Sequence, residues 1–171
     1  MDYRPWTIDY GLLNMDEKRK QYIEQFGVFL EKTGSSPVAG RIIGYLITAN
    51  PPQATFYELQ NFLNASKSTI STSLNLLLKK KVIDYITIPG DRKRYFVINI
   101  DSWLDMLMQQ ALFFKGLRQF ITEGVDIRKE KESDFSQGLL DICDLYQELE
   151  KEIPSAIERW KISKNKTKGR E

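Results

Sequence analysis

The chain has 171 residues, of which 42% are hydrophobic and 28% charged, with no histidine and a single cysteine. This composition fits one domain, or one domain with appended helices. The absence of histidine excludes serine–histidine triads, histidine acid–base chemistry and the usual zinc sites. Cys143 cannot form an internal disulfide, and its apolar helical neighbours favour a small core residue. We therefore expect no enzyme activity, no metal and no cofactor.

Charge is unevenly distributed along the chain, although its net value is only +2. Residues 66–94 contain seven Lys/Arg against two Asp/Glu, and residues 161–171 contain five against one. The two segments carry net charges of +5 and +4, so the rest of the chain carries a net charge of −7. Such asymmetry is typical of a polyanion-facing surface on an acidic body. No apolar run could span a membrane and the N-terminus lacks a signal-peptide core, so we expect a cytoplasmic protein.

Two helices are expected in the first fifty residues. An apolar stripe at helical spacing predicts a helix over 16–32. Ser36-Pro37 begins a second helix, since serine is a good N-cap and proline is favoured in the first turn. Asn50-Pro51-Pro52 ends it. Gly40 and Gly44 lie one turn apart on the same face, so we expect another helix to approach closely there.

The next segment has the pattern of a helix-turn-helix. Thr55-Phe56-Tyr57-Glu58 forms a predicted capping box that begins a short helix over 56–63. Asn64-Ala65 makes a tight turn, and Ser66 is a good N-cap for the helix that follows. Two short helices joined by a tight turn are characteristic of this motif.

The second of these helices has one apolar stripe and one polar face. The polar face carries short side chains that are weak helix formers, where strong helix formers are expected. Such a face suits a surface pressed against hydrogen-bonding base edges in the DNA major groove. A solvated helix face is the alternative. The residues on this face are Lys67, Ser68, Ser71, Thr72 and Asn75.

The hydrophobic period changes after Lys81. Residues 82–88 and 93–99 are rich in β-branched and aromatic side chains and predict two strands. The intervening Pro89-Gly90-Asp91-Arg92 has turn chemistry. A basic hairpin directly after a helix-turn-helix predicts a wing that reaches phosphates or the minor groove. Its tip holds Arg92, Lys93 and Arg94.

The rest of the chain predicts two long helices. Asp101 is expected to cap the first, which is apolar around much of its circumference. The charged stretch 123–133 is expected to contain the break between them. Pro154 is expected to start a new turn or kink the second helix. The second helix also shows a coiled-coil-like seam with steps of three and four residues, formed by Leu139, Ile142, Tyr146, Leu149 and Ile153.

Over residues 16–162 the order of these elements resembles the MarR family of bacterial transcription regulators. The runs 40–46, 66–71 and 90–95 are similar to its GbsR-like branch. The fold class is therefore expected to be mainly α with a small β-hairpin wing, a winged helix-turn-helix plus terminal dimerisation helices. The expected divisions are a 1–35 N-terminal arm and dimerisation helix, a 36–100 winged helix-turn-helix domain, 101–162 dimerisation helices and a 163–171 basic disordered tail.

The resemblance implies a homodimer that binds double-stranded DNA, with repression as its expected effect, and in many members a small-molecule effector. Together with the two motifs, it predicts DNA contacts from Ser66, Lys67, Ser68, Thr69, Ser71, Thr72, Asn75, Lys79, Arg92, Lys93 and Arg94. An aromatic effector pocket is predicted from Tyr45, Trp103, Phe113 and Phe114, although aromatic residues at helical spacing are more often core. No membrane partner is expected.

Two other classes of protein contain winged helices. One is a protein-interaction module without DNA binding, because a fold does not fix its function. That class predicts an apolar or acidic face on the second helix of the motif, which this sequence lacks. The other is the dimerisation half of a methyltransferase, for which no residues remain to build a catalytic domain.

Overall fold

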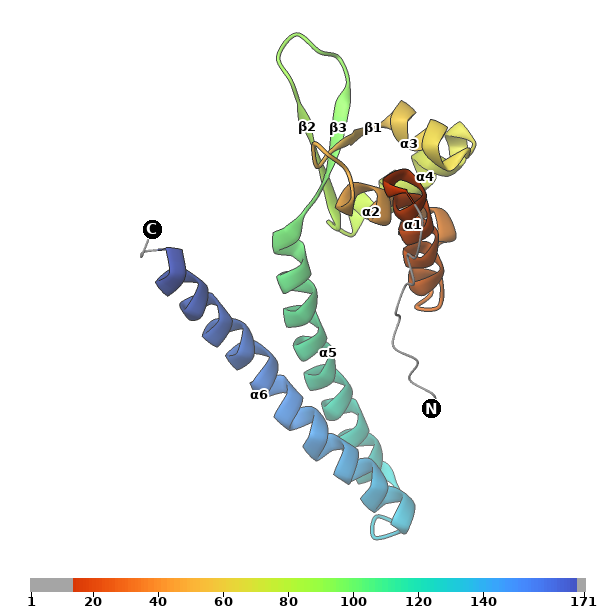
Figure 1. The fold of residues 1–171 in the computed structure, drawn as a ribbon. Coiled ribbons are helices and arrows are strands. Elements are labelled where there is room, and N and C mark those ends of the chain that lie inside the picture. The colour runs from red at the N-terminus through yellow and green to blue at the C-terminus, as the bar shows by residue number, and fades with distance from the viewer. Residues whose placement is uncertain (1–13, 169–171) are drawn as a thin grey trace. The chain divides into compact units, whose positions relative to one another are not determined.

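The computed structural model describes residues 14–168, with side chains described as far as Lys164. The described chain is mostly helical with one small antiparallel sheet, in agreement with the predicted fold class (Figure 1). It divides into two compact units, Met1–Ile100 and Asp101–Glu171. The elements are α1 (Met15–Glu31), α2 (Pro37–Ile47), β1 (Ala54–Thr55), α3 (Phe56–Leu63), α4 (Lys67–Lys79), β2 (Ile83–Thr87), β3 (Arg94–Ile98), α5 (Ile100–Ile127) and α6 (Asp134–Lys168).

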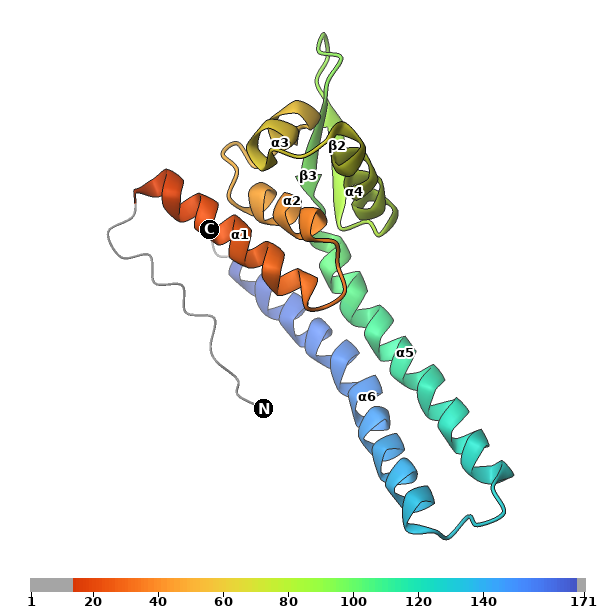
Figure 2. The same cartoon turned by 90° about the vertical axis from the view of Figure 1, so that its right-hand side faces the viewer.

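Helices α1 and α2 pack closely because glycines replace side chains where they cross (Figure 2). A Cβ on Gly40 would lie 3.0 Å from the Cα of Gly27, and a Cβ on Gly44 would lie 3.3 Å from the Cα of Ile23. Larger side chains would push the helices apart, since real Cβ contacts are rarely so short. The close approach expected from these glycines is confirmed, with α1 as the partner.

Local hydrogen bonds begin and end the helices of the helix-turn-helix as the sequence predicts. Thr55 and Glu58 form a capping box, in which the Thr55 N–H donates to Glu58 Oε2 at 2.7 Å. Asn64 ends α3 with φ +46°, a left-handed conformation that asparagine tolerates. The Ser66 hydroxyl then accepts the Thr69 N–H at 3.1 Å and begins α4.

The sheet has the strand order β1-β3-β2. β2 and β3 form the predicted hairpin, each one residue shorter at both ends than expected from sequence. β1 was not predicted, because two residues are too short to show a hydrophobic period. It pairs with β3 through Ala54–Phe96 and Thr55–Tyr95. This pairing connects the start of α3 to the wing.

The core of the first unit lies between α2, α3, α4 and the sheet. Ile42, Leu59 and Ile70 are completely buried at its centre. Burial of such side chains stabilises a fold by about 1.5–3 kcal/mol each. The apolar stripe of α4 therefore fixes which of its faces points outward. Ile70, Leu74 and Leu77 point into the core, and the polar face is left on the surface.

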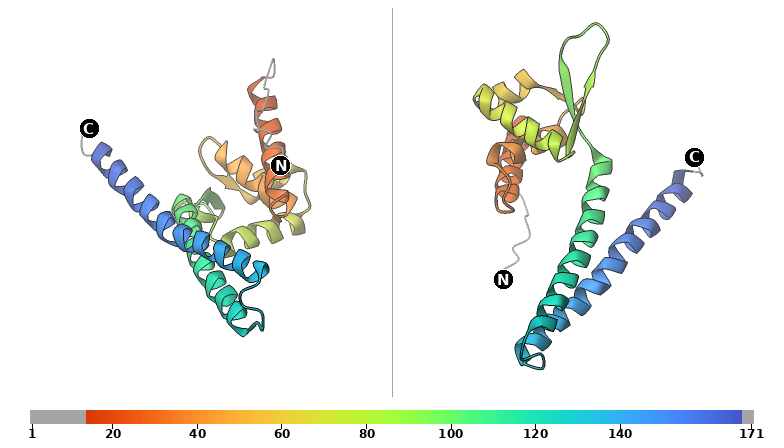
Figure 3. Two further views of the ribbon diagram at one scale, coloured as in Figure 1. Left: turned by 90° about the horizontal axis from the view of Figure 1, so that it is seen from below. Right: turned by 180° about the vertical axis from the view of Figure 1, so that it is seen from behind.

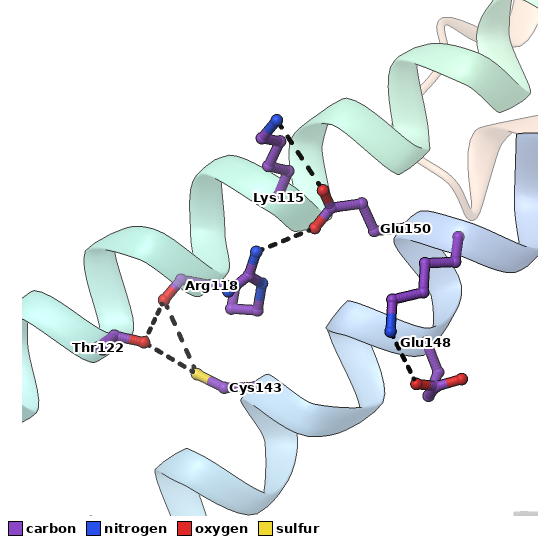
Figure 4. A network of polar contacts seen from close by, with 7 residues as sticks. Lys115, Arg118, Thr122, Cys143, Glu148 and Glu150 are labelled. Atoms are coloured by element: carbon purple, nitrogen blue, oxygen red, sulfur yellow. Dashed lines mark hydrogen bonds and ion pairs between the residues drawn. The ribbon is translucent and has the colours of Figure 1, made fainter.

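The second unit is a hairpin of two long helices (Figure 3). Figure 4 shows contacts that join them: Arg118 pairs with Glu150 at 3.2 Å, and the Cys143 thiol lies 3.8 Å from the Arg118 carbonyl oxygen. Phe114 stacks on Tyr146 with ring centroids 5.1 Å apart. Cys143 is buried, as expected for a small core residue, whereas Ile142 of the predicted seam is 41% exposed. The packed side of α6 therefore passes through Cys143 rather than Ile142.

Three expectations for this unit differ from the structure. α5 begins at Ile100, so Asp101 lies in the first turn instead of capping it. The Asn99 N–H donates to the Val82 carbonyl, and the helix starts directly after this last sheet bond. Pro154 does not start a new helix but lies inside a continuous α6, where it removes one intrahelical hydrogen bond; the alternative that it kinks the helix stays a prediction. α6 also runs through Lys168, so the predicted disordered tail is helical from 163 to 168.

The division between the two units coincides with the predicted boundary at residue 101. The predicted boundary at residue 35 lies inside the first unit, where α1 packs on α2. Residues 1–13 of the predicted N-terminal arm and residues 169–171 of the predicted tail lie outside the described residues. Along the described chain, every helix is too short or too polar to cross a membrane.

Candidate nucleic-acid interface

The polar face of α4 is exposed over its whole length. Lys67, Ser68, Ser71, Thr72 and Asn75 are all exposed, while Ser73 points inward and is buried. Lys79 continues the exposed face into the last turn. Because the serine, threonine and asparagine side chains of this face are short, a flat or grooved partner could approach the helix closely. The face thus offers hydroxyl, amide and ammonium groups that match base edges and phosphates.

Ser66 and Thr69 differ from the other predicted contact residues. The Ser66 hydroxyl accepts the Thr69 N–H and lies 2.8 Å from the hydroxyls of both Ser68 and Thr69. These bonds hold the first turn of α4 together, so their primary role in the free protein is capping. The Thr69 N–H is taken by this cap, and the N–H groups of Lys67 and Ser68 are left at the helix start, where a phosphate is favoured.

The turn of the wing is held by Asp91. The Asp91 N–H donates to the Ile88 carbonyl at 2.9 Å, and Gly90 adopts φ +85°, the combination that defines a type II turn with Pro89 and Gly90 at its centre. The Asp91 carboxylate accepts the Lys93 N–H at 2.9 Å and the Tyr95 hydroxyl at 2.7 Å. These two bonds fix the conformation of the residues that carry the basic side chains.

These hydrogen bonds alter the acidity of both partners. The Tyr95 hydroxyl, followed by the Lys93 N–H, lowers the pKa of Asp91. The same bond raises the pKa of Tyr95, because the neutral hydroxyl is the donor. At neutral pH the wing therefore has an ionised carboxylate at its turn and a protonated phenol behind it.

The basic side chains of the wing remain on the surface. Arg92, Lys93 and Arg94 are exposed. The Arg94 guanidinium lies 4.6 Å from the centre of the Tyr85 ring on the neighbouring strand. This cation–π contact restricts Arg94 while leaving guanidinium N–H groups for phosphate oxygens. Sequence reasoning missed Tyr85, whose only signal is its cross-strand position diagonal to Arg94.

The structure brings the wing and α4 to one concave surface in the first unit. The hollow in this surface has a volume of about 550 Å³. Of the predicted DNA contacts, it contains Ser71 and Asn75 from α4 and all three basic wing residues. Lys67, Ser68, Thr72 and Lys79 lie elsewhere on the exposed face of α4. The surface is completed by residues not predicted for it: Thr55, Phe56 and Tyr57 at the start of α3, Leu74 and Leu78 of α4, and Phe96 of β3.

The predicted effector residues do not form one group in either unit. Tyr45 lies in the first unit, where its ring packs edge-on against Phe62 at 4.9 Å. In the second unit, Phe114 stacks on Tyr146, while Trp103 and Phe113 are exposed. Tyr45 and Phe114 therefore have packing roles, and an effector site formed by these four residues stays a prediction.

Comparisons with known proteins agree with this geometry. No known family model matches the chain. The chain is 24% identical over 140 residues to the HTH-type transcriptional regulator MmpR5 of Mycobacterium tuberculosis, covering 82% of this chain and 85% of that protein. A crystal structure of a transcriptional regulator aligns with a TM-score of 0.66 and 24% identity over 84% of this chain and 98% of that chain. The structural match supports the fold, and the sequence match is to a regulator rather than an enzyme.

Proposed function

Because the chain is a winged helix-turn-helix protein resembling the MarR family, we propose that it is a sequence-specific DNA-binding transcriptional regulator that acts as a homodimer. The observation that carries this proposal is the concave surface shared by the polar face of α4 and the basic wing. We assign the chain to the GbsR-like branch on the runs 40–46, 66–71 and 90–95.

In this proposal, α4 reads bases and the wing binds the backbone. Asn75 can make paired hydrogen bonds to adenine, and Lys67 can reach guanine or a phosphate. Ser71 and Thr72 allow the helix to approach the groove. Arg92 and Arg94 bind phosphates or the adjacent minor groove, which adds affinity without sequence information. The exposure of all these side chains supports the assignment.

The second unit supports the homodimer. Several large apolar side chains of α5 and α6 are at least half exposed in the single chain, including Met106, Leu107, Leu112, Phe113, Phe120 and Leu145. Apolar patches of this kind mark interaction sites. We propose that the α5–α6 hairpin of a second copy of this chain covers the exposed apolar side chains. Two α4 helices held about 34 Å apart then fit successive major grooves, so the operator should be an inverted repeat.

A dimer on an operator can exclude the transcription machinery, and we propose repression as its effect. A small-molecule effector tunes a regulator of this kind only when it binds the DNA-competent and DNA-incompetent states with different affinities.

Selection of bound duplexes from a random pool, followed by fluorescence anisotropy, tests the proposed function. The wild-type protein is expected to enrich an inverted repeat. Asn75→Ala should cost about 1–3 kcal/mol on the selected site and relax the preference at the contacted base pair. Gln147→Ala on the exposed surface of α6, outside the proposed dimer face, is the matched control and should leave both unchanged. Failure to enrich any DNA, with a folded protein, favours the interaction-module class.

A further inference from the structure

A second and smaller cavity lies in the first unit, away from the polar face of α4. Its volume is about 210 Å³, below the range of about 300–1,000 Å³ typical of drug-sized ligands. Side chains from α1, α2, α3, β3 and the loop after α2 line it. They include Arg19, Tyr45, Asn50, Gln53, Glu58 and Tyr95.

Arg19 is held rigidly at this cavity. Its Nε donates to the Thr48 hydroxyl at 3.2 Å, and its guanidinium lies 4.3 Å from the centre of the Tyr45 ring and 5.5 Å from that of Phe62. Among the described residues, no carboxylate lies within 4.0 Å of it. The four N–H groups on its two Nη atoms therefore remain for a ligand, and they can bind a carboxylate with two parallel hydrogen bonds.

Glu58 supplies the opposite charge in the same cavity. Its Oε2 accepts the N–H and the hydroxyl of Thr55, both at 2.7 Å, and these bonds lower the pKa of Glu58. The group is consequently ionised at neutral pH, with Oε1 left for a further donor. Since no ion pair joins Arg19 to Glu58, both charges are available to a ligand.

We propose that this cavity binds a small zwitterion, such as an α-amino acid, with its carboxylate on Arg19 and its ammonium on Glu58. The small volume limits the ligand to a few heavy atoms beyond its charged groups. The amides of Asn50 and Gln53 supply neutral hydrogen bonds at the cavity wall. Glu58 is exposed and Arg19 is half-buried at this cavity, so a ligand carrying both charges can pair with both groups at once, which an anion or a cation alone cannot.

The cavity is connected to the DNA surface by two hydrogen-bonded pairs. Tyr95 lines the cavity and donates to Asp91, which holds the wing turn. Glu58 lines it and caps α3 through Thr55, which also lines the concave surface shared with α4. Resting on the proposed function, we infer that occupancy of the cavity changes the affinity for DNA.

Calorimetric titration of the full chain without DNA tests the ligand class. The probes are L-alanine and L-glutamine, with propionate and ethylamine as analogues that each lack one charge of alanine. Either amino acid is expected to bind at least about tenfold more tightly than both analogues, because each analogue leaves one protein charge unpaired. Binding of propionate as tight as that of alanine contradicts the zwitterion, as does the absence of amino-acid binding up to about 10 mM.

Variants locate the site. Arg19→Gln and Glu58→Gln should each weaken amino-acid binding by about tenfold or more. Glutamine at position 58 keeps the capping box, which accepts Glu or Gln, so Glu58→Gln remains informative where loss of Arg19 unfolds the chain. Lys20→Gln, on the exposed side of α1, is the matched control and should bind normally. Normal binding by the Glu58 variant would overturn the assignment.

The link to DNA is measured separately on a selected duplex. Saturating amino acid should change DNA affinity, and DNA should change amino-acid affinity by the same factor, about fivefold or more. Asp91→Ala removes the acceptor of the Tyr95 hydroxyl without altering the cavity lining, so it should reduce that factor while leaving amino-acid binding in place. Amino-acid binding with unchanged DNA affinity contradicts the link but not the proposed function. Failure to bind any duplex contradicts the proposed function and leaves the calorimetric result standing.

Discussion

The two units bury their apolar side chains in different ways. In the first unit, Ile23, Ile42, Leu46, Leu59, Ile70 and Ile83 are almost completely buried within one chain. In the second, burial is limited to small or scattered positions such as Ala111 and Cys143, while Leu112, Phe120 and Leu145 stay more than half exposed. The winged unit therefore has a core of its own, whereas the helical hairpin has an exposed apolar surface, which we propose is covered by a second chain.

Truncation of the winged core should have the largest effect. Ile42→Ala removes a completely buried side chain and should lower the free energy of unfolding by about 2–5 kcal/mol. Urea denaturation of the full chain measures this loss. Ile47→Ala on the same helix, where the side chain is 41% exposed, is the control and should cost less than about 1 kcal/mol. Equal losses would mean that α2 does not face a core within the chain.

Charging the exposed face of the hairpin should break the dimer instead. Leu145→Lys removes an apolar contact of about 1.5–3 kcal/mol and places a charge in the interface. The dimer dissociation constant should rise by at least about tenfold in sedimentation equilibrium. Gln147→Lys adds the same charge without removing apolar surface, and its dimer should persist. A wild-type chain that is a folded monomer at micromolar concentration would contradict the proposed role of this face.

Replacing a glycine by alanine should change the unfolding free energy in opposite directions in the two units. Gly40→Ala puts a Cβ 3.0 Å from the Gly27 Cα and should cost about 1–3 kcal/mol of unfolding free energy. Gly124→Ala in α5 meets no atom within 4 Å and should stabilise the chain by about 0.5–1 kcal/mol through its higher helix propensity. Thermal unfolding measures both. A neutral Gly40→Ala would show that α1 and α2 can separate without cost.

The smallest effect concerns the acidity of the wing turn. Tyr95→Phe removes the largest cause of the lowered pKa of Asp91, so that pKa should rise toward its usual 3.8. Carboxyl NMR titration measures the change, with Tyr57→Phe as control.

The pKa directions also set the pH window of this bond. The lowered Asp91 pKa means that the contribution of the bond to stability is present above pH 3.8 and is lost as pH falls below it. The raised Tyr95 pKa means that it is also lost as pH rises above 10. An unchanged Asp91 pKa in the phenylalanine variant would contradict the hydrogen bond from the Tyr95 hydroxyl to Asp91.

The sequence predicts the winged unit better than the hairpin because its signals are local. Capping by Thr55 and Ser66, the turn at Gly90 and the close approach at Gly40 each depend on neighbouring residues or on a missing side chain. The strand β1 is too short to show a period. The continuity of α6 through Pro154 depends on a helix that tolerates one lost hydrogen bond, which the residue type alone does not reveal.

The candidate site also has features that the sequence predicts and features that it does not. The exposed face of α4 follows from helical periodicity, and the basic wing tip follows from turn chemistry. The contribution of Tyr57 to the concave surface, and the contacts Tyr95–Asp91 and Tyr85–Arg94, depend on how elements meet in space. The expected aromatic pocket stays a prediction; Tyr45 packs on Phe62 in the first unit and Phe114 packs on Tyr146 in the second.

The salt dependence of DNA binding tests the central claim most directly, because it counts the phosphates neutralised by the protein. The affinity of the wild-type protein for its selected duplex is measured from low to high salt and compared with that of the Arg92→Ala/Arg94→Ala variant. The variant should bind all sequences more weakly, with the slope of log affinity against log salt flattened by about one to two units. An unchanged slope in a folded dimeric variant would contradict contact between the wing and DNA.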